Sequence, residues 1–576
     1  MNNWESVYHK WNTFQNLDPE LKKELVSIES NQLALEDAFY KELTFGTGGM
    51  RGVLGVGTNR MNIYTVRKAV YGLASYLLKN SVNVKDRGVA IAYDSRYKSR
   101  EFAIETAKTL GAFGIRAYVF HSIRPTPLLS FAVRYLGTAG GVMITASHNP
   151  PEYNGFKVYN EDGGQMIPEE ANQIIQEIQD IDNELDIPII EQPELEEKKL
   201  LVWVGDGVDN AYLEKLSLIT KLSHDECKQP KDLKIVFTPL HGTASELVPA
   251  GLKQLNFDQV SVVEEQMVPD PEFSTVSSPN PEEHQAFTMA IGLGKKVNAD
   301  ILLGTDPDAD RLGVAVKTKS GDYTVLTGNQ LGALLIDYIL SHTNPVLLAN
   351  DRVIKTIVTS ELGKAIAESY GVKTIDTLTG FKYIAAKIRQ FDTTGEAFVF
   401  GYEESYGYLI SSFTRDKDAI QVAVMASEMA DYWKKQGMTL LDALESLYKK
   451  HGYYRETMSS LTLKGKAGAE KISQIMHTIR DNPLTDIAGL KVEMLEDYLV
   501  GKRYINASST IEKIDLPAEN VLKFTLANDS WVCLRPSGTE PKIKCYFGTC
   551  GVNESESEAT LNQLKDYMNN VMHQII

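Results

Sequence analysis

The sequence predicts a multi-domain α/β protein, with three similar α/β modules followed by a smaller α+β domain. The chain has 576 residues, and a single domain holds roughly 100–200, so three to five domains are expected. Short apolar runs alternate with longer amphipathic segments up to about Tyr454, as in strand–helix units. Beyond Tyr454, strand-like segments dominate.

The first part of the chain contains two predicted helices and the first module. Amphipathic segments around Trp4–Phe14 and Glu20–Phe39 predict two helices without visible chemistry. The segments GVAIAYDSR, EFAIETAKTLGAFG, RAYVF, LLSFAVRYLG and GGVMITAS then alternate as strand, helix, strand, helix and strand. This order predicts a parallel sheet with helices on its faces.

Two more modules and a C-terminal domain follow an acidic stretch at residues 187–197. One module runs from KIVFTPLHGTA to ADILLGTDPDADR and the next from QLGALLIDYIL to EAFVFGYEES. No sequence identity connects the modules, so their similarity is inferred from pattern alone. The predicted domains are residues 1–204, 205–322, 323–453 and 454–576.

Composition limits the classes of function. The hydrophobic fraction of 43% and the charged fraction of 23% are typical of soluble globular proteins, and no apolar run approaches the ~18 residues of a membrane span. The first residues lack the features of a secretory signal, so we expect a cytoplasmic protein. The net charge of −17 argues against nucleic acid as a partner. Four cysteines without a CxxC pair are expected to be reduced thiols.

The segment GTDPDADRLG predicts a metal site. Asp306, Asp308 and Asp310 alternate directly after an apolar strand, so three carboxylates can converge on a hard cation such as Mg²⁺. An EF-hand is excluded, because Arg311 and Lys317 stand where that loop requires glycine and glutamate. The alternative is a solvated acidic turn, but three crowded carboxylates repel each other unless a positive charge neutralises them.

The segment GVMITASHNPPEYNGFKVY places a serine at the end of another apolar strand. Ser147 is predicted to lie on an exposed turn stiffened by Pro150 and Pro151, with His148 and Lys157 near it in sequence. The surrounding A-S-H does not match the GxSxG of a serine hydrolase. A serine that carries a phosphoryl group beside a metal fits better. A capping serine before a proline turn is the alternative.

Three other polar loops complete the set of motifs. LRPSGTEPKIKCY offers Arg535 with two hydroxyls for a phosphate, or is a plain hairpin turn. GYEESYGY offers Glu403, Glu404 and Ser405 for sugar hydroxyls, or is an exposed acidic loop. FGTGGMRG lacks the strand and helix of a dinucleotide fingerprint, so we expect a flexible loop that brings Arg51 towards an anion.

Together these motifs resemble the α-D-phosphohexomutase family over nearly the whole chain. FGTGGMRG, TASHNPPEYNGFK, GTDPDADR, GYEES and RPSGTEPK occur in the order and at the spacing of that family. Smaller matches are YDSR, RPTP, TPLHGT and TGFKYI. The resemblance implies three mixed α/β domains and a C-terminal α+β domain around a central active-site cleft.

The resemblance also implies a reaction and its participants. Members of the family move a phosphoryl group between two positions of a sugar, through a phosphoserine enzyme and a bisphosphorylated intermediate. For this chain it implies glucose 1-phosphate and glucose 6-phosphate as substrates, one Mg²⁺ per subunit, and glucose 1,6-bisphosphate as activator and intermediate. Sugar phosphates are then the expected partners, with no nucleic acid and no membrane, and the protein is expected to be a monomer or a weak homo-oligomer.

The resemblance assigns roles to individual residues. Ser147 matches the phosphoserine, and the metal ligands are Ser147, Asp306, Asp308 and Asp310. The catalytic acid/base and charge-stabilising groups match Lys157, His148 and Arg51. The substrate-binding positions are Arg311, Thr379, Gly380, Lys382, Glu403, Ser405, Arg535, Ser537, Gly538 and Thr539. We expect Lys157 to take the sugar-hydroxyl proton, with a pKa lowered by burial beside Arg51.

One position departs from a common form of the family. Many phosphomannomutase-type members have a histidine two residues after the serine of the sugar loop, where this chain has Gly407. The longer chain and the GYEESYGY form resemble the branch of phosphoglucomutase and phosphopentomutase-like enzymes. Mannose or pentose phosphates, and less so a sugar phosphatase reaction, are the alternatives. A catalytically silent sugar-phosphate-binding protein is a further alternative, against which the intact Ser147 and aspartates argue.

Overall fold

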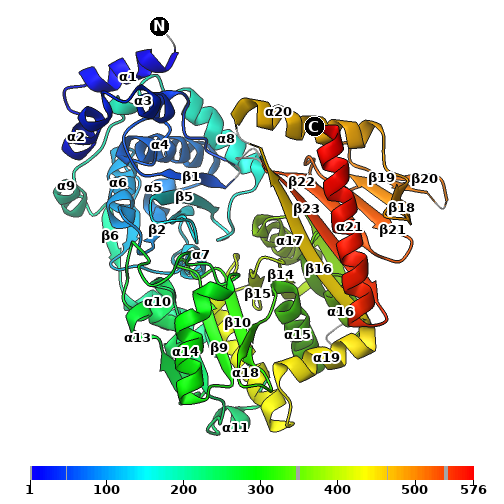
Figure 1. The fold of residues 1–576 in the computed structure, drawn as a ribbon. Helices are drawn as coiled ribbons and strands as arrows, with labels where there is room; N and C mark the ends of the chain where they lie inside the picture. The colour runs from blue at the N-terminus through cyan, green and yellow to red at the C-terminus, as the bar shows by residue number, and fades with distance from the viewer. Residues whose placement is uncertain (1–2, 47, 345–349, 464, 507, 538–541) are drawn as a thin grey trace. The chain divides into compact units, whose positions relative to one another are not determined.

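The structure is a computed structural model that describes residues 3–46, 48–344, 350–463, 465–506, 508–537 and 542–576. The chain divides into two compact units (Figure 1). Unit 1 comprises Met1–Gly328 and Phe381–Thr439, and unit 2 comprises Asn329–Gly380 and Leu440–Ile576. Among the described residues no helix is both long and apolar enough to cross a membrane.

Unit 1 begins with three short helices, coloured blue in Figure 1. They are α1 (Asn3–Thr13), α2 (Pro19–Ile28) and α3 (Gln32–Phe39). The second predicted helix is therefore wrong as a single element, because Asn31 accepts a hydrogen bond from Ala34 N and begins a new helix. Trp11 and Phe39 are buried with ring centroids 5.7 Å apart, which packs these helices into a small core of their own.

The first sheet of unit 1 has the strand order β1-β5-β4-β2-β3-β6. Its strands are β1 (Gly49–Val53), β2 (Val89–Tyr93), β3 (Ala117–Phe120), β4 (Gly140–Ile144), β5 (Tyr153–Asn160) and β6 (Leu201–Val204). Its helices are α4 (Ile63–Asn80), α5 (Val84–Arg87), α6 (Ser99–Ala112), α7 (Thr126–Leu136), α8 (Pro168–Gln179) and α9 (Gln192–Glu197), with the 3₁₀ turn η1 (Glu184–Asp186). Strands β2, β3, β4 and β6 are parallel, as predicted.

The remaining two strands of this sheet correct the sequence-based expectation. β1 pairs antiparallel with β5, and β5 pairs antiparallel with β4. The FGTGGMRG segment is therefore partly a strand rather than a flexible loop, and Arg51 lies opposite Gly155. Gly49 has φ of +134°, and a Cβ there would lie 1.9 Å from Phe156 O, so this close pairing requires glycine.

The second sheet of unit 1 has the order β11-β10-β9-β7-β8. Its strands are β7 (Ile235–Thr238), β8 (Val260–Val262), β9 (Ile301–Thr305), β10 (Leu312–Lys317) and β11 (Tyr323–Val325). The helical segments around it are α10 (Asp206–Leu216), α11 (His224–Cys227), η2 (Thr243–Ser245), α12 (Leu247–Gln254), α13 (Glu264–Met267), η3 (His284–Phe287) and α14 (Thr288–Val297). Every residue of β9 is buried, as expected for a strand covered on both faces.

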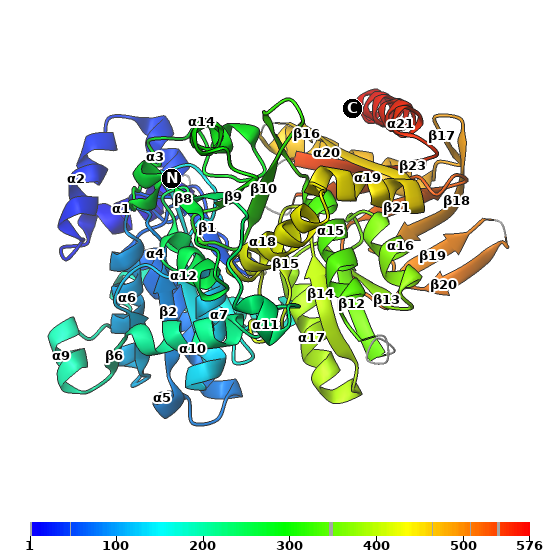
Figure 2. The ribbon, with the colours of Figure 1, turned by 90° about the horizontal axis from the view of Figure 1, so that it is seen from below.

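Part of the third predicted module also belongs to unit 1. These elements are α17 (Phe381–Thr394), β14 (Ala397–Tyr402), β15 (Tyr408–Leu409) and α18 (Ala419–Lys435). β14 and β15 form an antiparallel pair around the GYEESYGY segment. α18 packs against β15 and β10 (Figure 2), and Asp418 caps its first turn.

Unit 2 is built on one large antiparallel sheet of order β16-β23-β22-β21-β18-β19-β20, with β17 paired to β18. Its strands are β16 (Tyr453–Thr462), β17 (Asp486–Ile487), β18 (Leu490–Asp497), β19 (Lys502–Ile505), β20 (Thr510–Lys513), β21 (Leu522–Leu526), β22 (Trp531–Pro536) and β23 (Lys542–Gly551). The helices α20 (Gly465–Asp481) and α21 (Glu554–Ile575) belong to the same apolar core, and α21 crosses β16 and β23 (Figure 1). The parallel pair β12 (Asp351–Thr356) and β13 (Lys373–Thr377) also lies in unit 2. Its further helices are α15 (Gly328–Ser341), α16 (Leu362–Ser369) and α19 (Leu440–His451).

Candidate active site

The three aspartates lie together in the turn between β9 and β10, inside unit 1. Asp306, Asp308 and Asp310 are all buried, and their carboxylate oxygens lie within 4.8 Å of one another. Asp306 Oδ1 accepts hydrogen bonds from the backbone N–H of Asp310 at 3.1 Å and of Arg311 at 3.0 Å. The turn thus folds around the first aspartate and points the other two towards the same point.

Neighbouring loops hold this turn in place. The Thr126 hydroxyl donates to Asp308 Oδ2 at 2.8 Å. The Thr243 hydroxyl and backbone N–H both donate to Pro307 O, at 2.9 and 2.8 Å. A Cβ at Gly242 would lie 2.5 Å from Pro307 Cα, so only glycine permits this approach. The RPTP and TPLHGT motifs therefore support the aspartate turn.

The aspartate cluster fits a Mg²⁺ ion. Oδ1 of Asp308 and Oδ1 of Asp310 are buried and accept no hydrogen bond from the described residues, and buried polar atoms normally have a partner. Burial and the carboxylates of Asp308 and Asp310 raise the pKa of Asp306. A bound divalent cation would give these two oxygens a partner and reduce the repulsion between the carboxylates, and carboxylate oxygens are the ligands Mg²⁺ prefers.

Ser147 lies beside this cluster, on the turn after β4. Its Oγ donates to Asp306 Oδ2 at 2.7 Å and lies 3.2 Å from His148 Nδ1. Its backbone has φ of +54°, in the left-handed region, and its N–H donates to Thr145 Oγ1 at 2.8 Å. Only 3% of Ser147 is exposed, so the expectation of an exposed turn is wrong at the serine itself, although Pro150 is exposed.

Lys157 reaches the same cluster from β5. Its Nζ lies 2.7 Å from Asp308 Oδ2 and 3.3 Å from Asp310 Oδ2. Burial lowers the pKa of Lys157, but the carboxylates of Asp308 and Asp310 outweigh it and raise this pKa overall. The predicted lowering of the pKa beside Arg51 is therefore wrong for this arrangement of charges, because two carboxylates directly contact the ammonium and stabilise its charged form.

His148 and Arg51 line the turn of Ser147. Arg51 is exposed and donates from Nη1 to Asn149 Oδ1 at 2.9 Å. Burial, Arg311 and Arg51 lower the pKa of His148 to about 3, so its imidazole is neutral at neutral pH. The structure thus brings the predicted catalytic residues Ser147, His148, Lys157 and Arg51 together.

Lys417 is a residue of this site that the sequence did not reveal. Its Nζ lies 3.2 Å from Asp310 Oδ2 and 3.0 Å from Asp416 Oδ1. A Cβ at Gly407 would lie 2.2 Å from Lys417 Cδ. The stem of Lys417 thus occupies the space that a side chain at position 407 would need. The signal in the sequence is a lysine between two aspartates in TRDKDA, shortly after the sugar motif.

The predicted sugar loop adjoins the aspartate turn within unit 1. Glu403 is buried and Ser405 is partly buried. The backbone N–H of Leu312 donates to Tyr406 O at 3.1 Å, which ties this loop to the start of β10. Arg311 forms a backbone bridge with Gly407, and its guanidinium pairs with Glu282.

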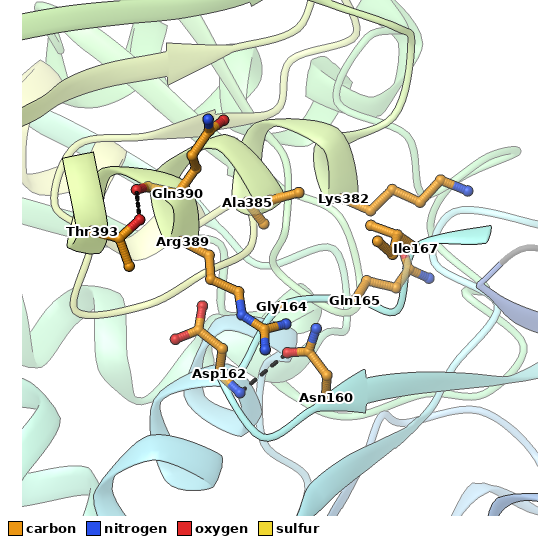
Figure 3. Close-up of a pocket in the computed structure, with 11 residues that line it drawn as sticks. Asn160, Asp162, Gly164, Gln165, Ile167, Lys382, Ala385, Arg389, Gln390 and Thr393 are labelled. Atoms are coloured by element: carbon orange, nitrogen blue, oxygen red, sulfur yellow. Dashed lines mark hydrogen bonds between the residues drawn. The ribbon is translucent and has the colours of Figure 1, made fainter. Parts of the chain in front are cut away.

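Lys382 lies on α17, in the wall of a cavity of about 350 Å³ (Figure 3). Asn160, Gln165 and Arg389 also line this cavity. Gln165 donates to Gly48 O at 2.9 Å, which connects the cavity wall to the segment before Arg51. The predicted role of Lys382 in substrate binding stays a prediction.

The predicted phosphate loop belongs to unit 2. Arg535, on β22, pairs through Nε with Glu519 Oε1 at 3.0 Å, and about a quarter of its side chain is exposed. The backbone N–H of Ser537 donates to Lys542 O at 2.7 Å. Gly538 and Thr539, predicted to complete this loop, lie outside the described residues.

Thr379 and Gly380 also belong to unit 2, where they follow β13. The hydroxyl of Thr379 is buried and has no hydrogen-bond partner among the described residues. Gly380 has φ of +121°, which other residues rarely adopt. Both observations are compatible with the predicted contact to substrate, which stays a prediction.

Fold and site together define a multi-domain α/β protein with a serine beside three buried carboxylates that fit a divalent cation. The chain matches four consecutive family descriptions of Phosphoglucomutase/phosphomannomutase: alpha/beta/alpha domain I over residues 42–185, domain II over 210–321, domain III over 327–451, and the C-terminal domain over 490–570. The chain belongs to the phosphoglucomutase/phosphomannomutase family, within the α-D-phosphohexomutases. The predicted fold class is confirmed, while the predicted domain boundaries stay a prediction.

Curated relatives and solved structures agree with this assignment. The chain is 42% identical over 520 residues to the phosphoglucomutase of Staphylococcus aureus strain MRSA252, covering 90% of this chain and 91% of that protein. For strain bovine RF122 / ET3-1 the identity is 44% over 513 residues, covering 88% and 90%. A putative phosphomannomutase from Thermus thermophilus shares the fold with a TM-score of 0.66 at 21% identity, covering 92% of this chain and 99% of that one. The open form of pp63/parafusin from Paramecium has a TM-score of 0.65 at 17% identity, covering 93% and 95%.

Proposed function

We propose that this protein is a phosphoglucomutase that interconverts glucose 1-phosphate and glucose 6-phosphate. The observation that carries the proposal is the buried Ser147 hydroxyl, 2.7 Å from a carboxylate of a buried cluster of three aspartates. The two Staphylococcus aureus relatives, both named phosphoglucomutase, favour glucose as the sugar. Phosphomannomutase and phosphopentomutase reactions are the alternatives on the same scaffold.

Ser147 is the proposed carrier of the phosphoryl group. In the forward half-reaction the bond between phosphorus and Ser147 Oγ breaks, and a bond between phosphorus and the free sugar hydroxyl forms. The sugar hydroxyl loses one proton and Ser147 Oγ gains one, so the step has no net loss of protons and Ser147 ends it as a hydroxyl. The product is glucose 1,6-bisphosphate, which returns its other phosphoryl group to Ser147 in the second half-reaction. Bisphosphate supplied from outside therefore acts as an activator.

The aspartates and cations around Ser147 would stabilise this transfer. Asp306, Asp308 and Asp310 would hold Mg²⁺, which supplies neutralisation of the phosphoryl charge as it moves. Lys157 and Arg51 supply fixed positive charge at the same place. Lys157 keeps the proposed role of proton acceptor from the sugar hydroxyl, but only as the amine: its ammonium must first give up a proton, which the carboxylates of Asp308 and Asp310 oppose. Removing its amino group should cost about 10²–10⁴-fold in rate.

The other proposed contacts hold the sugar and its second phosphate. Glu403 and Ser405 would accept and donate hydrogen bonds to sugar hydroxyls, because carboxylates suit paired hydroxyl donors. Arg535, Ser537, Gly538 and Thr539 would bind the phosphate that is not being transferred, and Arg311, Thr379, Gly380 and Lys382 complete the proposed substrate contacts. We further propose a cytoplasmic enzyme that acts as a monomer or a weak homo-oligomer.

A comparison of substrates tests the proposed sugar. Purified protein is assayed with glucose 1-phosphate, mannose 1-phosphate and ribose 1-phosphate, each with Mg²⁺ and a trace of the matching bisphosphate. We expect the highest kcat/KM with glucose 1-phosphate and no release of inorganic phosphate in step with substrate loss. A preference for ribose 1-phosphate would replace the glucose assignment, and stoichiometric phosphate release would make the protein a phosphatase.

The variant Ser147→Ala tests the proposed carrier. We expect mutase activity to fall to background, since no hydroxyl remains to receive the phosphoryl group. Intact mass spectrometry after incubation with glucose 1,6-bisphosphate should show one added phosphoryl group on the wild-type protein and none on the variant. Undiminished activity of Ser147→Ala would contradict the proposal.

A further inference from the structure

Arg96 follows the end of β2 and binds the turn that carries Ser147. Its side chain is completely buried. Nη2 donates to Ser147 O at 2.6 Å and to Asn149 O, and Nη1 donates to Pro150 O at 2.8 Å and to Tyr153 O at 3.1 Å. The two terminal nitrogens carry four N–H bonds, so every one of them has a backbone carbonyl of this turn as its acceptor.

The guanidinium itself is held from two sides. Asp94 Oδ2 lies 3.4 Å from Arg96 Nε, and Asp94 Oδ1 accepts from the Ser99 hydroxyl at 2.6 Å. The ring centroid of Phe273 lies 4.9 Å from the guanidinium carbon. Phe273 comes from the loop between α13 and η3, which belongs to the second α/β module. Arg96 therefore lies between an acidic partner on its own sheet and an aromatic ring from the module of the aspartates.

Arg96 acts on a residue whose backbone is strained. Ser147 has φ of +54°, a left-handed conformation that residues other than glycine rarely adopt. The N–H of Ser147 is bound by Thr145 Oγ1 and its carbonyl by Arg96. Because both polar backbone atoms are bound, the backbone fixes the direction of the Cα–Cβ bond, and the hydrogen bond to Asp306 then orients Oγ.

We propose that Arg96 is a positioning residue for phosphoryl transfer: its planar guanidinium, stacked on Phe273, holds the Ser147 turn in its left-handed conformation in both the phosphorylated and the free state. The proposal rests on the proposed role of Ser147 as carrier. The serine exchanges a neutral hydroxyl for a charged phosphate in every cycle, so a turn held only by its side chain would have a different rest position in each state. The contacts of Arg96 with the backbone carbonyls do not depend on whether Ser147 Oγ carries a phosphoryl group.

The geometry explains why arginine is required. A guanidinium presents its donors in a rigid fork, whereas a lysine presents three donors from one atom. A lysine in place of Arg96 would keep the charge opposite Asp94 but would leave carbonyls of the turn without a donor. Because the described side-chain contacts of Arg96 are backbone oxygens, Asp94 and Phe273, its loss should affect the rate of transfer and leave sugar binding unchanged.

The test compares Arg96→Lys with the matched control Arg67→Lys. Arg67 lies in the same sheet domain, pairs with Glu105 at 2.5 Å and stacks over Tyr64 at 5.0 Å, and its described contacts do not include the Ser147 turn. For each variant we would measure the folded fraction, the Tm, kcat and KM for glucose 1-phosphate, and the single-turnover rate of Ser147 phosphorylation by glucose 1,6-bisphosphate. Displacement of a reacting group by about 1 Å costs roughly 10²-fold, so Arg96→Lys should lower kcat and the phosphorylation rate about 100-fold with KM within about twofold. Arg67→Lys should lower only the Tm.

A second variant decides the matter if Arg96→Lys does not fold. Phe273→Leu removes the stacked ring while Arg96 and its hydrogen bonds remain. It should lower kcat about three- to tenfold at unchanged KM, because the Ser147 turn is displaced less than in Arg96→Lys. Wild-type kcat per folded molecule in Arg96→Lys, or in Phe273→Leu where the first variant is unfolded, would overturn the proposal. Wild-type protein that takes up no phosphoryl group on Ser147 would instead overturn the proposed function itself, so the two failures are distinguishable.

Discussion

Ser147 and Arg535 are both proposed to contact phosphate, but the protein holds them in different ways. The N–H, the carbonyl and the hydroxyl of Ser147 are each hydrogen-bonded, to Thr145, Arg96 and Asp306. Arg535 is a partly exposed side chain that pairs with Glu519. The difference teaches that the turn of Ser147 is arranged before substrate arrives, whereas the proposed phosphate contact of Arg535 depends on a side chain that can exchange Glu519 for another anionic partner.

The largest effect on activity is expected from a substitution in the aspartate cluster beside Ser147. Asp308→Asn removes one charge from the metal site and leaves a neutral group opposite Lys157, so kcat should fall about 10³-fold, because a bound metal supplies several kcal/mol to the transition state. KM for glucose 1-phosphate should change little. Steady-state kinetics at saturating Mg²⁺ measure both quantities.

The control for this prediction is a substitution of the same type at an aspartate outside the cluster. Asp232→Asn, at an exposed position of the second module, should leave kcat and KM unchanged. An Asp308→Asn protein that loses only affinity for substrate would contradict this prediction. It would show that the aspartate cluster serves substrate binding, as proposed for Arg535, rather than phosphoryl transfer.

A substitution of Arg535 is expected to have a smaller effect, on KM rather than on kcat. A hydrogen bond to a charged group contributes about 1.5–3 kcal/mol, so Arg535→Met should raise KM for glucose 1-phosphate about 10–100-fold, with a smaller change in kcat. Arg503→Met is the control, since Arg503 pairs with Glu496 and Glu512 in the same unit. A fall in kcat at constant KM would place Arg535 with the transfer groups instead.

The smallest effect is expected on the stability of unit 2, which should depend on pH through the carboxyl group of Glu456. Burial raises the pKa of Glu456 on β16 to about 7, although Ser360 and Asn329 donate hydrogen bonds to its carboxyl group and partly oppose that rise. A carboxyl with a raised folded-state pKa contributes stability that is present at low pH and is lost as pH rises through that pKa. The unfolding free energy around β16 should therefore fall by up to about 1.4 kcal/mol per pH unit between about pH 4.5 and 7.

Hydrogen exchange of the Tyr453–Thr462 amides at pH 5 and pH 7, corrected for intrinsic rates, measures this change. Glu456→Gln should abolish the pH dependence, because an amide keeps hydrogen-bonding groups without titrating, while the exposed Glu512→Gln should preserve it. Equal pH dependence in wild type and Glu456→Gln would reject the assignment to this carboxyl group.

Much of the fold was predictable because buried parallel strands have an unmistakable pattern. β2, β4 and β9 are apolar runs that end in polar or glycine-rich loops, and each was predicted. β1 was not, because its glycines suggest a loop and its strand conformation depends on pairing with β5. The β19–β20 hairpin was missed because its residues are largely exposed and polar, so no alternating apolar face marks them.

The candidate site divides in the same way. Asp306, Asp308 and Asp310 were predictable because one short segment contains all three. Lys417 was not, because Asp310 is distant in sequence and becomes its neighbour only after two modules pack. The role of Arg96 was not, because the carbonyls that it binds are distant in sequence and come close only when β2 and β4 pair in one sheet. The pKa of Lys157 was predicted to be lowered but is raised, because the local sequence did not reveal that two carboxylates face its ammonium.

The left-handed backbone at residue 147 restricts which hydroxyl amino acid can stand there. Threonine offers the same oxygen for a phosphate ester, but its branched Cβ is strongly disfavoured at positive φ. A Ser147→Thr protein would have to abandon either the turn or the alignment of its oxygen. Among residues able to form a phosphate monoester on an aliphatic oxygen, this position therefore accepts serine alone.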